Sequence, residues 1–306
     1  QSMIDGAFRF PLRFTRVLDL SWRDAPVAQV TGVGIGLETD FDDNHYHNLV
    51  DLAPRAAALR HPWFRQYDEI ALYTYSLQHN PALDHLVRRL LPDNVRVVHV
   101  DKNTTIQPDV LLMLDPPMDA WYCVPPAWYL RAVRDVCGSG DGAATGDPIY
   151  ISRQGAKKRR IVNEDRLLDE LGDRGFRSVR TETLGPGQVI ELMGRAPMVV
   201  AMTGAGLANT IYCRPGASVV ELSAADHWSP ELFFIAQAAG LDFRSSIGRD
   251  AGCPTSRWRG NKYHQFRHDY YRRRDADLEA DIDGVCAIVD ECLGRSATGD
   301  HEVPTP

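Results

Sequence analysis

Residues 198–213 read Met-Val-Val-Ala-Met-Thr-Gly-Ala-Gly-Leu-Ala-Asn-Thr-Ile-Tyr-Cys, and this stretch decides the fold that we expect. The first five residues are apolar, as in a buried strand, and residues 207–213 can form a helix, so a glycine loop lies between strand and helix. Glycines let the backbone approach a ligand closely, and the free N–H groups of a helix start favour an anion. The stretch therefore predicts a phosphate-binding loop, unless its glycines serve only close packing.

The next apolar segment, residues 217–222, predicts a second strand beside the first. It carries a single carboxylate, Glu221, which we expect at the end of the strand. A carboxylate accepts hydrogen bonds, so Glu221 is suited to bind the hydroxyl groups of a ribose or another sugar.

The rest of the chain repeats the alternation of strand and helix. Asn163 is expected to cap one helix, and Pro186 to open the next. The alternation predicts an α/β protein with parallel sheets flanked by helices. Strands are expected at residues 27–33, 69–75, 95–100, 149–152, 176–180, 198–202 and 218–222, and helices at 47–59, 83–91, 164–171, 187–193 and 207–213.

Glycine and small polar residues at 137–148 predict a linker between two domains. The N-terminal domain then covers residues 4–136 and the C-terminal domain residues 149–274. A closing helix is expected at 275–293 because Leu278, Ile282, Val285, Ile288 and Val289 form one apolar stripe. Residues 294–306 are expected to be a disordered tail.

The composition is that of an ordinary globular protein of 306 residues, with 44% hydrophobic and 25% charged residues. A net charge of −7 argues against nucleic acid as a partner. The six cysteines lack C-x-x-C spacing, so we expect no metal site and a reduced, cytoplasmic location. No apolar run approaches the length of a membrane span, so any membrane association, for instance at the inner face of the cell membrane, would be peripheral. Arginine far outnumbers lysine, which suggests a bacterial, GC-rich genome.

The block that reads Asn44-His-Tyr-His47-Asn-Leu-Val-Asp51-Leu-Ala-Pro54-Arg55 carries a candidate general base. In a helix, His47, Asp51 and Arg55 share one face, whereas His45 does not. An Asp one turn from a His can fix its tautomer and raise its basicity. Pro54 predicts a kink nearby. The alternative is that these polar residues pair with one another at the surface.

A cationic loop, Ser152-Arg153-Gln-Gly-Ala-Lys157-Lys158-Arg159-Arg160, follows the first strand of the C-terminal domain directly. Arginine can grip a phosphate with two hydrogen bonds. With the glycine loop it would surround a diphosphate and could replace a divalent metal. A solvated basic turn is the alternative.

Two further patterns are weaker. Residues 257–274 interleave basic and aromatic residues, which could stack on sugars or bases or form a solvated loop. Gly32-Val-Gly34-Ile-Gly36 resembles part of a dinucleotide fingerprint, but no convincing helix follows it, so we do not expect a cofactor loop there.

Taken in order, these blocks resemble the glycosyltransferase 61 family, which includes bacterial capsular-polysaccharide enzymes, plant xylan transferases and animal O-linked N-acetylglucosaminyltransferases. The resemblance is dense over residues 150–222 and thin elsewhere apart from the His47 block. The matching text is His47-x-x-x-Asp51-x-x-Pro54-Arg55, Ile151-Ser-Arg153, Arg159-Arg160-Ile-x-Asn163-Glu164, Gly175-Phe176, Glu182-x-Leu184, Gly204-Ala-Gly-Leu-x-Asn209 and Pro215-Gly-x-x-Val-Val-Glu221-Leu.

The resemblance implies a GT-B-like enzyme in which two Rossmann-like domains face a central cleft. Such an enzyme inverts the anomeric centre and moves a sugar from a nucleotide-sugar donor, with UDP as the expected nucleotide, to a glycan or small-molecule acceptor. His47 would be the base, oriented by Asp51, although Asp51 could be the base itself. His45 and Arg55 would lie on the acceptor side or support the base. The donor-binding residues would be Arg153, Arg159, Arg160, Thr203, Gly204, Ala205, Gly206, Leu207, Asn209 and Glu221.

The chain departs from the family pattern at two positions. Thr203 stands where the family often has a His that could grip phosphate, and a threonine hydroxyl offers a hydrogen bond but no charge. Asn48 stands where the family usually has an aromatic residue, which could change the acceptor. Two other functions therefore stay open: a non-catalytic nucleotide- or sugar-binding module, and an NAD-dependent oxidoreductase that uses the glycine loop.

Overall fold

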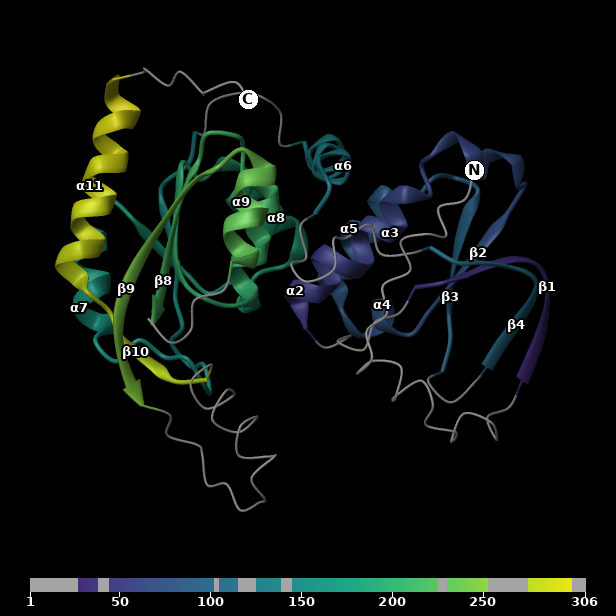
Figure 1. Ribbon diagram of the computed structural model, residues 1–306, viewed down its shortest axis with the longest axis horizontal. Coiled ribbons are helices and arrows are strands. Elements are labelled where there is room, and N and C mark those ends of the chain that lie inside the picture. The colour runs from purple at the N-terminus through teal and green to yellow at the C-terminus, as the bar shows by residue number, and fades with distance from the viewer. Residues whose placement is uncertain are drawn as a thin grey trace, which may run out of the picture. The chain divides into compact units, whose positions relative to one another are not determined.

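The computed structural model describes residues 27–37, 44–101, 105–114, 125–138, 145–224, 230–252 and 275–298. The chain divides into two compact units, Gln1–Tyr129 and Leu130–Pro306. Each unit contains its own sheet with helices packed against it (Figure 1). The protein is therefore a mixed α/β protein with parallel sheets, compatible with a Rossmann-like fold in each unit.

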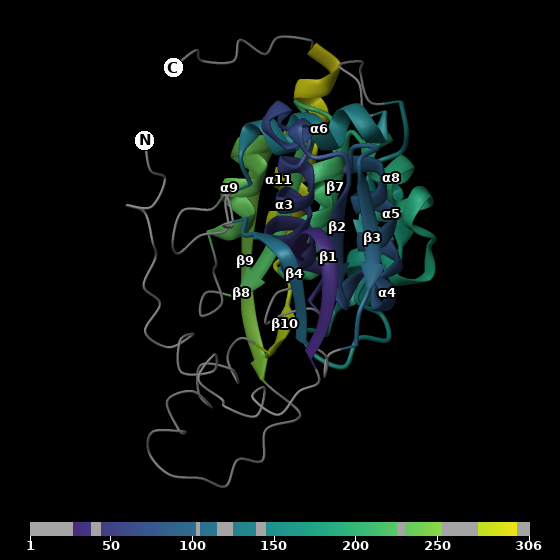
Figure 2. The same ribbon diagram turned by 90° about the vertical axis from the view of Figure 1, so that its right-hand side faces the viewer.

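The first unit has a four-stranded sheet in the order β3-β2-β1-β4, and every pair of neighbours is parallel (Figure 2). In chain order its elements are β1 (Val27–Gly36), α2 (His45–His47), the π-helical turn η2 (Asn48–Leu52), α3 (Ala53–Ala58), the 3₁₀ turn η3 (Pro62–Gln66), β2 (Ile70–Thr74), α4 (Ser76–His79), α5 (Pro81–Leu90), β3 (Val95–His99) and β4 (Thr105–Leu112). Helix α6 (Ala127–Cys137) spans the boundary between the units.

Strand β4 was not predicted from the sequence because Pro108 lies inside it. Proline cannot donate a backbone hydrogen bond, and a sheet tolerates it at an edge strand, which is where β4 lies. Gly34 lies within β1, and a Cβ there would come within 2.7 Å of the Tyr73 ring. The glycines of this segment thus belong to a strand, as expected for a pattern that is not a cofactor loop.

The helix expected at residues 47–59 is interrupted. Residues Asn48–Leu52 form a π-helical turn between α2 and α3. Pro54, in the first turn of α3, has no N–H to continue an α-helical ladder and its ring would clash with the carbonyl four residues earlier. A wider turn before the proline relieves both conflicts, so the kink expected at Pro54 takes the form of a π-bulge.

The second unit has a six-stranded sheet in the order β10-β9-β8-β7-β5-β6. All pairs are parallel except β9 with β10. The elements are β5 (Ile149–Ile151), α7 (Glu164–Asp173), β6 (Arg177–Val179), the 3₁₀ turn η4 (Thr181–Thr183), α8 (Pro186–Arg195), β7 (Met198–Met202), the 3₁₀ helix η5 (Ala205–Tyr212), β8 (Ser218–Ala224), α9 (Glu231–Ala239), β9 (Asp242–Gly252), β10 (Asp277–Glu279) and α11 (Ile282–Thr298).

Helices cover both faces of this sheet. Helices α7 and α11 lie on one face, and α8 and α9 on the other (Figure 1). Every residue of β7 and β8 is buried, as parallel strands covered on both faces require. The core on the first face joins Val200 and Leu222 of the sheet to Leu167 of α7 and Val285 of α11.

The structure corrects several local expectations in this unit. The helix after the glycine loop is a 3₁₀ helix that begins at Ala205. Asn163 precedes α7 without capping it, because its side chain bonds the backbone N–H and C=O of Ala280 at 2.9 Å each. Leu278 belongs to strand β10 and not to the closing helix, which runs to Thr298, past the expected end at residue 293. Strand β9 and helices α6 and α9 were not predicted.

Some expectations fall outside the described residues. These are the basic and aromatic segment 257–274, the tail at 299–306 and the middle of the expected linker, residues 139–144. No helix in the part of the chain that the structure describes is long and apolar enough to cross a bilayer.

Candidate functional site

The glycine loop and the cationic loop meet at the carboxyl ends of the strands of the second sheet. Counting from β5, the strands β6-β5-β7-β8-β9 follow the doubly wound order 2-1-3-4-5. In such sheets the chain turns to opposite sides after the two strands where the order reverses, and ligands bind at the carboxyl ends of those strands. Here the two strands are β5, which Ser152 and Arg153 follow, and β7, which Thr203 and Gly204 follow.

The side chain of Arg153 lies across the cationic loop. Its Nε donates to the carbonyl oxygen of Arg159 at 3.1 Å, and its Nη2 donates to that of Lys158 at 2.7 Å. Burial lowers the pKa of the Arg153 guanidinium, and the carboxylates of Glu182 and Glu164 act in the opposite direction. The guanidinium is therefore held in place by the loop and flanked by two acidic groups.

The Arg159 side chain also reaches the glycine loop. Its Nη1 donates to the carbonyl oxygen of Thr203 at 3.3 Å. A Cβ on Gly204 would lie 3.5 Å from Arg159 Nη1 and 3.6 Å from Arg153 Nη1. The two guanidinium groups thus meet over a residue without a side chain, and we call Arg153, Arg159 and Gly204 the anion seat.

Glu164, in the first turn of α7, fixes the start of the cationic loop. Its Oε1 accepts hydrogen bonds from the Tyr150 hydroxyl at 2.8 Å, the Ser152 hydroxyl at 2.8 Å and the Arg153 N–H at 2.9 Å. Burial raises the pKa of the Tyr150 hydroxyl well above its ordinary value, and Glu164 adds to the rise, so Tyr150 stays a donor. The sequence placed Glu164 only as a helix-start residue, and its side-chain role was missed.

Thr203 and Glu221 form a buried pair beneath the anion seat. The Thr203 hydroxyl lies 2.9 Å from Glu221 Oε1 and 3.2 Å from the carbonyl oxygen of Leu222. Glu221 has an exposed fraction of 0% and lies inside β8, not at its end as expected from the sequence. In this arrangement Glu221 holds the glycine loop through Thr203, and a ribose could reach its carboxyl only after the covering residues move.

Glu221 should make the stability of the fold depend on pH. Burial raises the pKa of its carboxyl to about 7, the Thr203 hydrogen bond opposes the rise, and Glu231 adds to it. The folded state binds this proton more tightly than the unfolded chain, so the stabilisation is complete below the unfolded pKa near 4.5 and is lost as the pH rises through about 7. We expect the free energy of unfolding to fall by up to about 3 kcal/mol over this range.

Urea unfolding at several pH values measures this effect. In Glu221→Gln the fall between pH 5 and 8 should shrink by most of that amount, whereas Glu191→Gln, at an exposed site, should keep the wild-type profile. Identical profiles for Glu221→Gln and the wild type would show that Glu221 ionises normally.

The candidate general base lies in the first unit. His47 Nδ1 is 2.9 Å from Asp51 Oδ2 across one turn of the helix, as predicted from their spacing. The His47 side chain is 19% exposed and that of Asp51 is 4% exposed. Asp51 is thus buried behind a histidine that solvent can still reach, which suits an orienting carboxylate.

Comparison with known proteins identifies the family of this chain. The model of the family Glycosyltransferase 61 matches residues 45–220, which is more than half of the chain. The chain belongs to the glycosyltransferase 61 family. The matched range contains the His47–Asp51 pair and the whole anion seat, whereas Glu221, β9, β10 and α11 lie beyond it. No curated protein matches the chain.

In this glycosyltransferase 61 chain the side chain of Arg160 points to a different part of the structure from that of Arg159. Its guanidinium bonds the buried carboxylate of Asp277 at 3.0 Å through Nε and 2.6 Å through Nη2. That ion pair holds the Arg160 side chain at β10, and Arg153 and Arg159 are the arginines at Gly204. The donor-binding role expected for Arg160 stays a prediction.

The other residues that we expect to bind the donor lie along the start of η5. Ala205 and Gly206 are half-buried, and Leu207 is buried. The Asn209 side chain is buried and donates to the carbonyl oxygen of Gly206 at 3.0 Å, so it braces the loop. The sequence placed these residues together correctly, and whether each touches a donor stays a prediction.

On the proposed acceptor side, His45 begins α2 and Arg55 lies in α3. The expected common face of His47, Asp51 and Arg55 assumed an unbroken α-helix. The π-helical turn Asn48–Leu52 contains Asp51 and precedes Arg55, so the three residues are not spaced as in an unbroken α-helix. Roles for His45 and Arg55 in the family reaction stay predictions.

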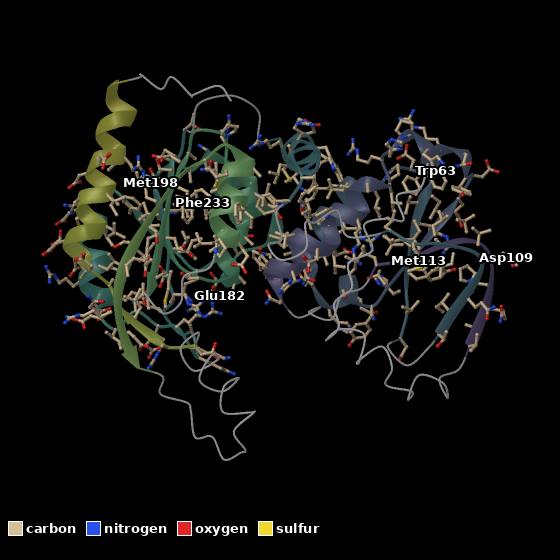
Figure 3. The ribbon with its side chains drawn as sticks, in the orientation of Figure 1. Trp63, Asp109, Met113, Glu182, Met198 and Phe233 are labelled. Carbon is tan, nitrogen blue, oxygen red and sulfur yellow. The ribbon has the colours of Figure 1, made fainter. Side chains whose placement is uncertain are left out.

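Sequence reasoning did not single out the carboxyl end of β6 as part of the site. Arg180 Nε donates to Glu182 Oε1 at 2.9 Å just past this strand. A Cβ on Gly155 of the cationic loop would lie 3.3 Å from Arg180 Nη2. Figure 3 shows Glu182 and Met198, which begins β7, at opposite ends of the sheet's strands. The charge of Glu182 acts on the Arg153 guanidinium, so Glu182 lies near the anion seat.

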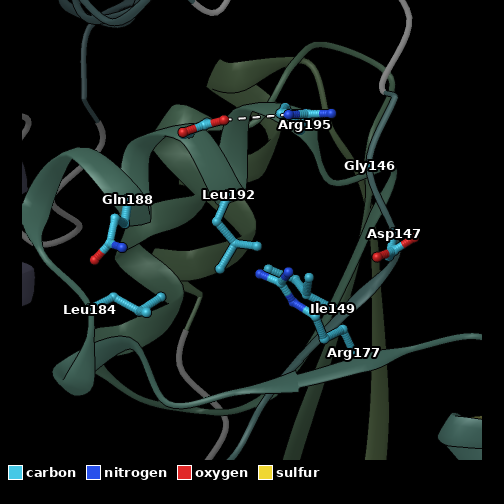
Figure 4. A pocket seen from close by; sticks show the side chains of 9 residues that line it. Gly146, Asp147, Ile149, Arg177, Leu184, Gln188, Leu192 and Arg195 are labelled. Atoms are coloured by element: carbon cyan, nitrogen blue, oxygen red, sulfur yellow. Dashed lines mark hydrogen bonds and ion pairs between the residues drawn. The ribbon is translucent and has the colours of Figure 1, made fainter.

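A surface hollow of about 330 Å³ lies near the amino ends of strands β5 and β6 of the same sheet (Figure 4). Its lining includes the first residues of β5 and β6, Ile149 and Arg177, together with the α8 residues Gln188 and Leu192. Because these are the amino ends of parallel strands, the hollow is separate from the anion seat. Among the residues described, no three His, Cys, Asp or Glu side chains are grouped as metal ligands.

Proposed function

We propose that this protein is an inverting glycosyltransferase that moves a sugar from a nucleoside-diphosphate donor to a hydroxyl group of a glycan or small-molecule acceptor. The observation that carries the proposal is the convergence of two guanidinium groups over Gly204 at the switch point of the second sheet. UDP is the first nucleotide to test, because the resemblance to the family favours it.

The anion seat supplies what the departing diphosphate needs. Breaking the bond between the sugar and the diphosphate builds negative charge on the leaving oxygens. Arg153 and Arg159 can donate charge-assisted hydrogen bonds to those oxygens, in a place where their positions are already fixed by Lys158, Thr203 and the loop itself. Fixed charge aimed at a leaving group is usually the largest contribution to catalysis.

The His47–Asp51 pair supplies the base. In the proposed step His47 removes the proton of the acceptor hydroxyl while that oxygen attacks the anomeric carbon and the diphosphate leaves from the opposite side. Asp51 orients the ring through Nδ1, which leaves Nε2 to accept the proton. A single displacement of this kind inverts the anomeric centre. This mechanism requires the first unit to present the acceptor and the second unit to hold the donor. We therefore propose a GT-B-like arrangement.

A panel of nucleotide sugars tests the proposal. We expect UDP or another nucleoside diphosphate to raise the melting temperature, and one of its sugars to be transferred or slowly hydrolysed. Stabilisation by a nucleoside diphosphate with no turnover of any sugar would favour a non-catalytic binding module. That alternative is motivated by Thr203, whose hydroxyl is engaged with Glu221. Stabilisation by NAD alone would replace the proposal by an oxidoreductase.

Removal of metal ions should leave the reaction intact. The arginines of the anion seat carry the charge that a divalent cation supplies elsewhere, so we expect the same transfer rate before and after treatment with EDTA. The rate is measured on the chelated enzyme with and without added manganese. Loss of activity that manganese restores would contradict a metal-independent mechanism.

The setting in which the enzyme works is also a proposal. A glycan acceptor suits polysaccharide biosynthesis. The arginine-rich, lysine-poor composition suits a bacterial source. We propose that the enzyme works in the cytoplasm, with at most a peripheral attachment to the inner face of the membrane.

A further inference from the structure

The end of the cationic loop and the two residues after it, residues 158–162, are bound to strand β10. We call residues 158–162 the far leg of the loop. Leu278 donates its N–H to the carbonyl oxygen of Arg160 at 2.8 Å, and Val162 donates its N–H to that of Leu278 at 2.8 Å. Ile161 and Leu278 form a parallel bridge. A segment more than a hundred residues later in the chain, beyond the range that the family model matches, thus supports one side of the anion seat.

Asp277 is the side chain that fixes this leg most tightly. Its Oδ1 accepts the Arg160 N–H at 2.8 Å, and its Oδ2 accepts from Arg160 Nε and Nη2. Asp277 is 3% exposed, so water cannot replace these bonds easily. One carboxylate therefore holds both the backbone and the side chain of Arg160.

Arg159, the residue just before, has a conformation that a side chain rarely adopts. Its φ is 53°, and it is the one non-glycine residue with a positive φ among those described. Left-handed residues with a Cβ persist only where neighbouring contacts fix them. In this conformation the Arg159 carbonyl meets the Arg153 guanidinium, and its own guanidinium reaches the carbonyl of Thr203.

We propose that Asp277 is a positioning residue of the donor site, which holds Arg160 so that Arg159 stays left-handed and aims its guanidinium over Gly204. The inference rests on the proposed function for the identity of the ligand, a diphosphate. Asp277 acts through Arg159 and does not touch the ligand.

The effect on affinity separates this role from a plain charge effect. Removing a carboxylate near an anion site should strengthen anion binding if charge alone mattered. We expect the reverse: in Asp277→Ala the Kd for UDP and for inorganic pyrophosphate should rise about tenfold. Asp277→Asn keeps an acceptor for the Arg160 N–H, so its Kd for both ligands should rise by about threefold or less. Asp275→Asn is the matched control, because Asp275 pairs with Lys158 of the same loop, and should change the Kd by less than about twofold.

A double-mutant cycle tests whether Asp277 acts through Arg159. In an Arg159→Gly background, Asp277→Ala should weaken binding of UDP no further, as titration calorimetry would measure. Equal weakening in both backgrounds, or wild-type affinity in Asp277→Ala, would overturn the inference. Far-UV circular dichroism of each variant checks that it is folded.

A second cycle needs no ligand. Glycine adopts φ near 53° without strain, so the change in Tm on Arg159→Gly should be more favourable by about 2 °C in the wild type than in Asp277→Ala, where the left-handed conformation of Arg159 is no longer enforced through Arg160. Equal changes in Tm would overturn the positioning role. If the wild type binds neither UDP nor pyrophosphate while this cycle shows coupling, the proposed function fails and the positioning of Arg159 stands.

Discussion

His47→Ala is expected to lower the rate of sugar transfer by about 10²-fold or more. His47 is the more exposed member of the His47–Asp51 pair. The variant removes its ring and with it the group that accepts the hydroxyl proton. The Kd for UDP should stay within about twofold of the wild type, because the anion seat belongs to the second unit. Both quantities follow from initial rates and from calorimetric titration.

Two variants make the result specific. His99→Ala removes an exposed histidine of the same unit and should leave the rate unchanged. Asp51→Asn keeps a polar group behind His47 but removes the charge, so we expect a smaller loss of about tenfold if Asp51 only orients the ring. A greater loss in Asp51→Asn than in His47→Ala would make Asp51 the base, and normal turnover in His47→Ala would exclude His47.

Arg153→Ala is expected to raise the Kd for UDP by about 30- to 100-fold, which corresponds to the loss of a charge-assisted, bidentate contact with the diphosphate. The loss has two sources. The guanidinium no longer meets the diphosphate, and the carbonyls of Lys158 and Arg159 lose the donors that close the loop.

The design of this test follows from the same contacts. Arg153→Lys keeps the charge but cannot bond both carbonyls as a fork, so its Kd should lie between those of Arg153→Ala and the wild type. Arg195→Ala, at an exposed ion pair on α8, is the matched control and should bind UDP normally. An unchanged Kd in Arg153→Ala would place the diphosphate elsewhere.

Much of the second unit could be predicted because its central strands are strongly apolar. The strand expected at residues 198–202 is β7 with the same bounds, and β5, β6 and β8 were located within a few residues. Strands β5, β7 and β8 are buried on both faces, so their sequences are mostly apolar runs between turn residues. The edge strand β6 is largely exposed.

Elements at the edge of the sheet were harder to predict. Strand β9 carries charged and small residues along its exposed half, and β10 is three residues long. Leu278 fits the apolar spacing of α11, yet it lies in β10 because antiparallel pairing with β9 satisfies its backbone. Local periodicity cannot detect a pairing between segments that are distant in the chain.

The site shows the same division. The sequence by itself determined that a strand leads into a glycine loop, that a run of cations follows the first strand of the second unit, and that His47 and Asp51 lie one helical turn apart. These features depend on residues close together in the chain.

Only the tertiary structure decided which cation faces the glycine loop. Arg159 and Arg160 are adjacent and chemically equivalent, but Asp277, 117 residues away, binds Arg160 and leaves Arg159 turned toward Thr203. The tertiary structure also placed Glu221 beneath the loop as the partner of Thr203. Side-chain direction at such positions depends on long-range hydrogen bonds in a buried setting, and no local pattern of residues encodes them.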